Sequence, residues 1–222
     1  MIMRFNFEAV IFDLDGVLTD TAHYHFLAWK RLAESLDIAF DETANEDLKG
    51  IDRMGSLDLI LGSTAHRYTH EQKCALAEEK NRYYQYLIAT MSPNDLLPGA
   101  LSALHLVKAS KLKIGLASVS KNASTVLERL QITTMFDDIV DAATISKSKP
   151  DPEIFLTAAS HLGIAPDRCL GVEDSIAGIR SIKSAGMTAL GIGKSSILTE
   201  ADKVITGLNL FSLHHLHSFE SK

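Results

Sequence analysis

The chain has 222 residues, of which 46% are hydrophobic and 23% are charged, and its formal net charge is −6 at pH 7. This composition is typical of a folded globular protein and argues against a disordered chain. No basic run supplies the cationic surface that a nucleic-acid backbone requires, so we expect no nucleic-acid partner. The apolar segments are too short to predict a membrane span.

The two cysteines, Cys74 and Cys169, form neither a CxxC pair nor a zinc-type cluster with histidines. This pattern predicts no disulfide framework and no structural zinc site. The opening segment MIMRFNFEAVIFDLDG is interrupted by acidic side chains and does not resemble a signal peptide. We therefore expect a cytoplasmic protein with reduced thiols and no membrane association, and we also expect a monomer.

Short apolar runs that recur along the chain predict buried parallel strands. They lie at Ala9–Phe12, Leu112–Ala117, Asp138–Val140, Cys169–Val172, Thr188–Ile192 and Lys203–Ile205. Helical patterns separate most of them, at Ala100–Ala109, Ala123–Leu130, Pro152–Leu162 and Ile176–Ala185. This alternation predicts an α/β fold with a doubly wound, Rossmann-like parallel sheet.

The interval from residue 21 to residue 91 breaks the alternation, because it contains only helical patterns. These patterns lie at His23–Leu36, Arg53–Leu61 and Glu71–Thr90. The segment SPNDLLPG that follows, with two prolines and a glycine, is typical of a linker. We interpret residues 21–91 as a helical cap domain inserted into an α/β core made of residues 1–20 and 92–222.

Polar side chains follow the predicted strands, where open α/β sheets bind their ligands. Asp13, Asp15 and Asp174 would repel one another there unless a cation neutralised them, and oxygen ligands favour Mg²⁺. Lys149 and Ser118 would face the same place and suit a phosphate group. The combination predicts metal-assisted phosphoryl transfer.

Four segments resemble, in order, the four motifs of the haloacid dehalogenase superfamily. They are DLDGVLTD at residues 13–20, LASVS at 116–120, SKPDPEIF at 148–155 and GVEDSIAGI at 171–179. The resemblance implies that Asp13 is the nucleophile, which forms an aspartyl-phosphate, and that Asp15 is the general acid/base. It implies that Ser118 and Lys149 bind the transferred phosphoryl group. The implied Mg²⁺ ligands are Asp13, Asp15 through its backbone carbonyl, Glu173 and Asp174.

The helical insert resembles the cap of the β-phosphoglucomutase subfamily. The similar features are KGIDR at residues 49–53, His25 and Trp29 four residues apart on one helix face, the pair KN at 80–81, and SKN at 120–122. The resemblance implies conversion of β-glucose 1-phosphate to glucose 6-phosphate through β-glucose 1,6-bisphosphate, with small sugar phosphates as the only ligands. The implied substrate- and phosphate-binding residues are Thr21, His25, Trp29, Lys49, Gly50, Arg53, Ser56, Lys80, Ser118, Val119, Ser120, Lys121, Asn122 and Lys149.

Two other functions stay open at this point. A phosphatase of the same superfamily, acting on small sugar phosphates, would have the same core and would differ at the cap, above all at Arg53, Lys49, His25 and Lys80. A catalytically idle binding domain could keep the fold, although every core catalytic position is filled. The segment GKS at residues 193–195 does not indicate a nucleotide-binding loop, because Thr188 stands where that motif requires glycine.

Overall fold

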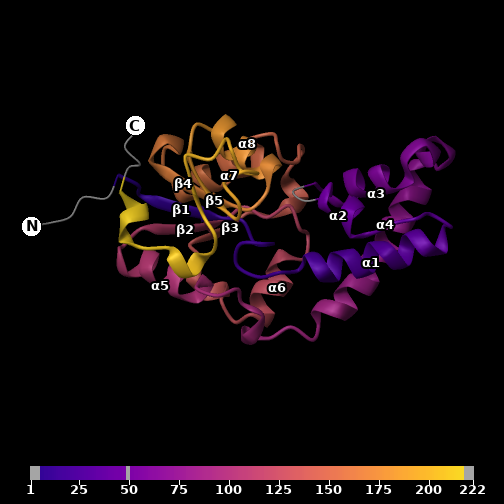
Figure 1. Cartoon of the computed structure of the whole chain (residues 1–222), viewed down its shortest axis with the longest axis horizontal. Coiled ribbons are helices and arrows are strands. Elements are labelled where there is room, and N and C mark those ends of the chain that lie inside the picture. Colours follow the sequence, from indigo (N-terminus) through magenta and orange to yellow (C-terminus); the bar gives the residue numbers. More distant parts are fainter. Residues whose placement is uncertain (1–5, 49–50, 218–222) are drawn as a thin grey trace, which may run out of the picture.

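The structure is a computed structural model that describes residues 6–48 and 51–217 (Figure 1). Within this part of the chain, six parallel strands form one sheet in the order β3-β2-β1-β4-β5-β6. The strands are β1 (Ala9–Phe12), β2 (Lys113–Leu116), β3 (Asp138–Ile139), β4 (Cys169–Glu173), β5 (Thr188–Ile192) and β6 (Lys203–Ile205). The predicted parallel α/β sheet is confirmed, and the strand ends differ from the prediction by at most a residue.

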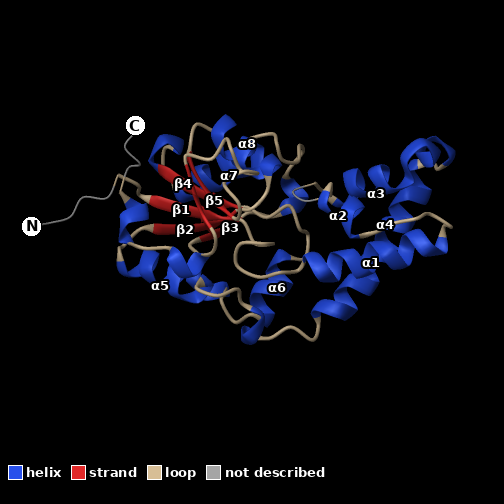
Figure 2. Cartoon of the chain, viewed as in Figure 1, coloured by secondary structure: helices blue, strands red, loops and turns tan. Residues whose placement is uncertain are grey.

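Helices cover both faces of the sheet, as Figure 2 shows. Successive side chains of a strand point to opposite faces, so Val10 and Phe12 pack in one core with α5 (Ala100–Ala109) and α6 (Ala123–Arg129). Ala9 and Ile11 pack in the other core with α7 (Glu153–Leu162) and α8 (Ile176–Ser184). Burial on both faces explains why the strands read as continuous apolar runs.

The helices α1 (Ala22–Ser35), α2 (Glu42–Glu46), α3 (Arg53–Leu61) and α4 (His70–Ile88) lie together to the right of the sheet in Figure 1. They share a separate apolar core that includes Trp29, Leu32 and Leu57. These helices fall inside the interval predicted for the cap, while the exact domain boundaries stay a prediction. The helix α2 was not predicted, because its five residues carry no apolar pattern.

Short 3₁₀ turns connect the longer elements, at Gly62–Arg67, Pro93–Asp95, Thr133–Met135, Ala142–Thr144, Pro166–Arg168, Leu208–Leu210 and Leu213–Leu216. Gly163 ends α7 with a φ of 70°, a left-handed conformation that glycine adopts without strain and that is typical of a helix C-cap. Across residues 6–48 and 51–217, none of the helices is both long enough and apolar enough to cross a membrane.

Strand register places the candidate site. Phe12 pairs with Leu116 of β2 and with Val172 of β4. The next residue, Asp13, donates its backbone N–H to the Val172 carbonyl, so it lies level with Glu173 at the carboxyl edge of the sheet. The cap helices lie beyond this edge in Figure 1. The sheet therefore delivers its polar strand ends to the junction between core and cap.

Candidate active site

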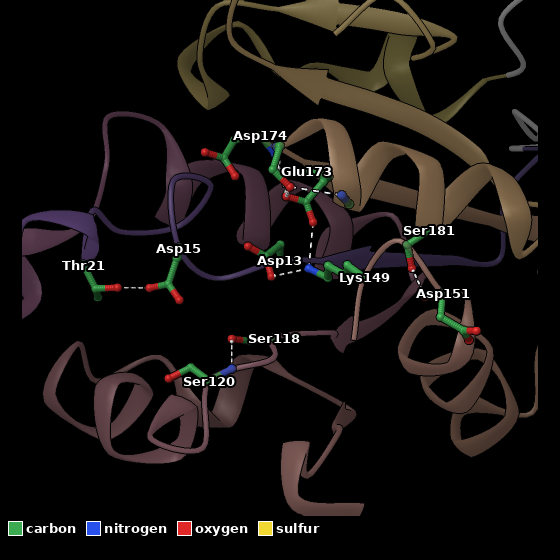
Figure 3. Close-up of polar contacts among 12 residues, drawn as sticks. Asp13, Asp15, Thr21, Ser118, Ser120, Lys149, Asp151, Glu173, Asp174 and Ser181 are labelled. Atoms are coloured by element: carbon green, nitrogen blue, oxygen red, sulfur yellow. Dashed lines mark hydrogen bonds and ion pairs between the residues drawn. The ribbon is translucent and has the colours of Figure 1, made fainter. Parts of the chain in front are cut away.

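Two buried carboxylates share one buried ammonium group at the carboxyl edge of the sheet (Figure 3). Lys149 Nζ donates to Asp13 Oδ1 at 2.7 Å and to Glu173 Oε2 at 2.7 Å. All three residues are at most 6% exposed. Buried charges are tolerated when they are paired and hydrogen-bonded. The group keeps one net negative charge when all three residues are ionised, which leaves it able to attract a cation.

The loop that carries Lys149 is pinned on both sides of the lysine. Glu153, in the first turn of α7, accepts hydrogen bonds from the backbone N–H groups of Ser146 at 2.9 Å and Lys147 at 2.7 Å. Ser181 Oγ of α8 donates to the Asp151 carbonyl at 2.6 Å (Figure 3). These bonds fix the path of the loop, so the long lysine side chain enters the site from a defined direction.

The protein groups alone raise the pKa of Asp13 to about 8, through burial first and through the charge of Glu173 second, with Lys149 opposing both. Burial would also raise the pKa of Glu173, but Lys149 and hydrogen bonds from Asp174 and Ser175 lower it below its ordinary value. Burial lowers the pKa of Lys149, yet the two carboxylates more than offset this and raise it. Asp13 is thus the group of the three that titrates nearest neutral pH.

A divalent cation fits the carboxylates beside this group. Asp13, Glu173 and Asp174 each offer an oxygen, and these oxygens lie within 4.8 Å of one another. Gly16 makes the approach of Asp174 possible, because a Cβ at Gly16 would lie 2.1 Å from Asp174 Oδ2, and its φ of +79° also favours glycine. Hard divalent ions prefer all-oxygen ligands. A cation there would lower the pKa of Asp13 and keep the carboxylate ionised.

Asp15 lies two residues after Asp13, and its side chain takes another direction. Thr21 Oγ1 donates a hydrogen bond to Asp15 Oδ1 (Figure 3). Burial raises the pKa of Asp15, while the Thr21 bond and the charges of Lys149 and Lys80 oppose the shift. Among the described residues, the carboxylate of Asp15 is not part of the three-carboxylate cluster. A carboxyl group with a raised pKa beside the nucleophile suits proton transfer.

A cavity of about 1040 Å³ lies between the edge of the sheet and the cap helices. Its wall contains most of the residues predicted for the site: Asp13, Asp15, His25, Trp29, Arg53, Ser56, Lys80, Val119, Ser120, Lys121, Asn122, Glu173 and Asp174. The fold therefore brings together side chains that are far apart in the sequence. What each of them does there remains a prediction.

Other predicted residues lie behind this wall or outside the described chain. Thr21 and Lys149 support it through their bonds to Asp15 and Asp13. Ser118 is 1% exposed, and its Oγ accepts a hydrogen bond from the backbone N–H of Ser120 at 3.2 Å. The predictions for residues 49 and 50, Lys49 and Gly50, fall outside the described residues.

On the cap side, Lys80 Nζ lies 2.8 Å from His25 Nδ1. The same ammonium lies 4.5 Å from the ring centroid of Trp29 and 4.8 Å from that of Tyr84, within cation–π distance. Burial, together with the charge of Arg53, lowers the pKa of Lys80 to about 7. Burial and the charge of Lys80 lower the pKa of His25 well below its ordinary value, so His25 is neutral and its Nδ1 accepts from Lys80.

Arg53 begins α3, and Asp52 is the N-cap of that helix. The Asp52 carboxylate accepts hydrogen bonds from the backbone N–H groups of Met54 at 2.8 Å and Gly55 at 3.0 Å. Arg53 Nη2 donates to Asn81 Oδ1 at 2.8 Å, and Nη1 lies 3.5 Å from Glu78 Oε2. The guanidinium therefore has a fixed direction on the cap wall of the cavity.

Contacts between the cap and the core include residues that sequence reasoning did not assign to the site. Ser148 Oγ donates to Asp52 Oδ2 across the cleft, at 2.5 Å. Asn122 Nδ2 of the core donates to Asn81 Oδ1 of α4 at 2.9 Å. An aspartate just before a helical pattern is a recognisable cap signal, so Asp52 was identifiable as an N-cap. The contact of Asp52 with Ser148 was not identifiable, because no sequence signal links residues 96 positions apart.

The buried pair of Asp13 and Lys149 at the carboxyl edge of a parallel α/β sheet is an arrangement that suits a phosphoryl-transfer enzyme. The family model for haloacid dehalogenase-like hydrolase matches residues 7–186. The chain therefore belongs to the haloacid dehalogenase-like hydrolase family.

Comparisons with individual proteins are more specific than the family model. The β-phosphoglucomutase of Bacillus subtilis (strain 168) is 51% identical over 212 residues, which are 95% of this chain and 94% of that protein. A phosphorylated carbohydrates phosphatase of Thermotoga maritima is 33% identical over 81% of this chain and 82% of that protein. The crystal structure of β-phosphoglucomutase from Clostridium difficile matches with a TM-score of 0.93 and 47% identity, over 95% of each chain.

Proposed function

We propose that this protein is a β-phosphoglucomutase, which converts β-glucose 1-phosphate to glucose 6-phosphate through β-glucose 1,6-bisphosphate. The observation that carries the proposal is the arrangement of one cavity with Asp13 at its core side and Arg53 on its cap wall. A bisphosphate needs such a cavity, because one phosphate must meet the nucleophile while a cation holds the other. The 51% identity to a β-phosphoglucomutase along almost the whole chain supports the same assignment.

The proposed reaction begins with a phosphoryl group on Asp13. The carboxylate of Asp15 accepts the proton of the substrate's C6 hydroxyl, whose oxygen attacks phosphorus, and the bond from phosphorus to the Asp13 oxygen breaks. The bisphosphate then turns end for end. Asp13 attacks the phosphorus at C1, and Asp15 returns the proton to the departing C1 oxygen. The enzyme regains its phosphoryl group, and each atom and proton is accounted for.

Mg²⁺ is the proposed metal, held by Asp13, Asp174, Glu173 and the backbone carbonyl of Asp15. When bound, it would neutralise charge on the transferring phosphoryl group and on Asp13. Lys149 would add a second positive charge and hold Asp13 in position, since its ammonium already bonds Asp13 and Glu173. The many hydrogen bonds to Glu173 support a further role for this residue, that of orienting Lys149.

Sugar-phosphate hydrolysis is the second candidate, supported by the 33% identity to a phosphatase of phosphorylated carbohydrates. The two activities share the phosphorylation of Asp13 and differ in what attacks the aspartyl-phosphate. A hydroxyl of a bound sugar phosphate gives isomerisation, whereas water gives hydrolysis. We further propose that the enzyme works as a monomer in the cytoplasm.

A direct assay separates these candidates. The purified protein is incubated with β-glucose 1-phosphate, Mg²⁺ and a catalytic amount of β-glucose 1,6-bisphosphate, and both glucose 6-phosphate and inorganic phosphate are measured. We expect glucose 6-phosphate to form much faster than inorganic phosphate, and we expect a chelator to stop the reaction. Release of inorganic phosphate as the main product would replace the mutase assignment by the phosphatase one.

A further inference from the structure

A single amide oxygen connects the cap wall of the cavity to its core wall. Asn81 Oδ1 accepts hydrogen bonds from Arg53 Nη2 of the cap at 2.8 Å and from Asn122 Nδ2 of the core at 2.9 Å. Arg53 and Asn122 line the cavity, whereas Asn81 lies behind them and is only 6% exposed. Two side chains on different parts of the molecule thus take their direction from the same atom.

The helix α4 presents more of this network along one face. Glu78, Asn81 and Gln85 are spaced three and four residues apart, so they lie on the same side of the helix. Glu78 Oε2 lies 3.5 Å from Arg53 Nη1, and Gln85 Nε2 donates to Asn122 Oδ1 at 3.2 Å. The face therefore contacts the guanidinium at one end and the core amide at the other, with Asn81 between them.

The chemistry of the two Arg53 partners differs in a way that matters for an anionic ligand. Asn81 is neutral and buried, so it orients the guanidinium without cancelling its charge. Glu78 is anionic, but its side chain is 55% exposed and the ion pair is long, so solvent weakens its effect. An arginine that is already held in position loses less side-chain entropy when it binds a phosphate.

We propose that Asn81 is a positioning residue that orients Arg53 and Asn122 together, so that both side chains meet the phosphate that is not being transferred. The proposal rests on the proposed function in one respect, namely that the ligand carries two phosphates. Asn81 acts through its two partners and touches neither phosphate. Its bond to Arg53 lies within the cap, whereas its bond to Asn122 crosses to the core and exists only when the cap and the core stand at the separation seen here. The distal phosphate site is therefore complete only in that arrangement.

A double-mutant cycle tests this role. Asn81→Leu removes the shared acceptor, and Arg53→Ala removes the residue through which it acts. The substrates are β-glucose 1,6-bisphosphate, whose consumption needs the distal phosphate to be held, and acetyl phosphate, which phosphorylates Asp13 but carries one phosphate only. We expect Asn81→Leu to raise KM for the bisphosphate about tenfold to hundredfold. The rate with acetyl phosphate should change by less than about threefold, because the core site is untouched.

In the Arg53→Ala background the additional effect of Asn81→Leu should fall below about threefold, since the main group that Asn81 orients is gone. A full additive effect in that background would overturn the proposal, and so would an equal loss with acetyl phosphate or an unchanged KM. If Asn81→Leu does not fold, Asn81→Ala removes the same atoms without added bulk. Gln85→Leu is the matched control, because it loses a bond to Asn122 and leaves the Arg53 contact intact. Its KM should rise less than that of Asn81→Leu.

The experiment also separates this inference from the mutase assignment. If the wild-type protein consumes the bisphosphate but does not isomerise β-glucose 1-phosphate, then the mutase assignment fails. The role of Asn81 is still decided in that case by KM for the bisphosphate and by the cycle with Arg53. If wild-type isomerisation is rapid and the cycle is additive, then the mutase assignment stands and the inference about Asn81 fails.

Discussion

At the scale of single residues, Lys80 shows how the cap places a cation in an unfavourable environment. The side chain is 4% exposed, and the charge of Arg53 lies close enough to oppose protonation. The charge of Asp15 raises the pKa of Lys80 only in part. The ammonium is also hydrogen-bonded to neutral His25 and lies over two aromatic rings. Such groups are common where a protein binds an anion, because the anion stabilises the charged form.

This placement predicts a particular dependence of stability on pH. The pKa of Lys80 is about 7 in the folded protein, below the value near 10.4 of an unfolded lysine. Between these values the unfolded chain holds a proton that the folded chain lacks, so stability rises with pH by up to about 1.4 kcal/mol per pH unit. Below pH 7 both states are protonated and the cost of burying the charge is fully present. Lys80→Met should remove this contribution to the slope.

The measurement is urea unfolding of the wild type and Lys80→Met at several pH values between 6 and 9. Relative to the wild type, Lys80→Met should have its highest unfolding free energy at the lowest pH. This advantage should shrink as the pH rises, because only the wild type gains stability through Lys80. Lys73→Met is the control, because Lys73 lies on the same helix and pairs with Asp58. Parallel curves for the wild type and Lys80→Met would show that Lys80 keeps an ordinary pKa.

At the scale of elements, the start of α3 combines a helix cap with a contact between the two parts of the molecule. One oxygen of Asp52 accepts from the first turn of α3, and the other accepts from Ser148. Ser148 directly precedes Lys149, which holds the proposed nucleophile. We therefore expect a movement of the cap at Asp52 to affect the loop that carries Lys149.

We expect Asp52→Ala to lower stability by about 0.5–2 kcal/mol through loss of the N-cap, and also to release the cap from the core. Spin labels on α4 and α5 would report the separation, which should become longer and more broadly distributed. Asp41→Ala is the matched control, because Asp41 caps α2 through Ala44 and, among the described residues, its hydrogen bonds stay within the cap. Asp41→Ala should lose comparable stability without any change in separation. If the two variants had the same distribution of distances between the labels, then Asp52 would not hold the cap against the core.

The helices and strands also show which parts of the fold can be predicted from the sequence alone. Buried parallel strands are read directly from apolar runs, so β1, β5 and β6 were predicted to the residue. The polar residues after those strands could be assigned to one site, since parallel strands share a carboxyl edge. The five-residue helix α2 escaped prediction because it depends on the Asp41 cap and on packing rather than on an apolar pattern.

Contacts across the cleft were beyond sequence reasoning for a physical reason. Asn81 and Asn122 meet because packing between elements places α4 beside the start of α6. The direction of a side chain was equally unpredictable. Asp15 stands in the expected acidic motif, but its carboxylate is hydrogen-bonded to Thr21 rather than placed among the other carboxylates.

At the scale of the whole molecule, the two halves supply opposite ends of one cavity. The core provides Asp13, Glu173 and Asp174, with Lys149 behind Asp13, whereas the cap provides Arg53 and Lys80. We expect the core groups to be sufficient for phosphorylating Asp13 and for attack by water on the aspartyl-phosphate. Isomerisation in addition requires a cap that keeps the second phosphate in place while the ligand presents its other end. We therefore expect the cap to decide between hydrolysis and isomerisation.

The variant Arg53→Ala tests whether the cap cation is needed for isomerisation but not for hydrolysis. The wild-type guanidinium has a fixed direction and a side chain only 19% exposed, so its contact with a phosphate would be partly desolvated and charge-assisted. Loss of such a contact costs on the order of 2–4 kcal/mol, roughly a thirtyfold to thousandfold fall in mutase kcat/KM. Attack by water on the aspartyl-phosphate needs no cap cation and should stay near the wild-type rate. The ratio of hydrolysis to isomerisation should therefore shift toward hydrolysis.

Both rates should be measured in the same preparation, by following glucose 6-phosphate and inorganic phosphate together. Arg82→Ala is the control, because Arg82 is an exposed arginine on α4 that does not line the cavity. It should leave both rates unchanged, which would exclude a general effect of lost cap charge. If hydrolysis and isomerisation fell together in Arg53→Ala, then Arg53 would support the cap fold rather than the distal phosphate. If isomerisation stayed at the wild-type rate, then another cation of the cavity wall, such as Lys121 or Lys80, would hold that phosphate.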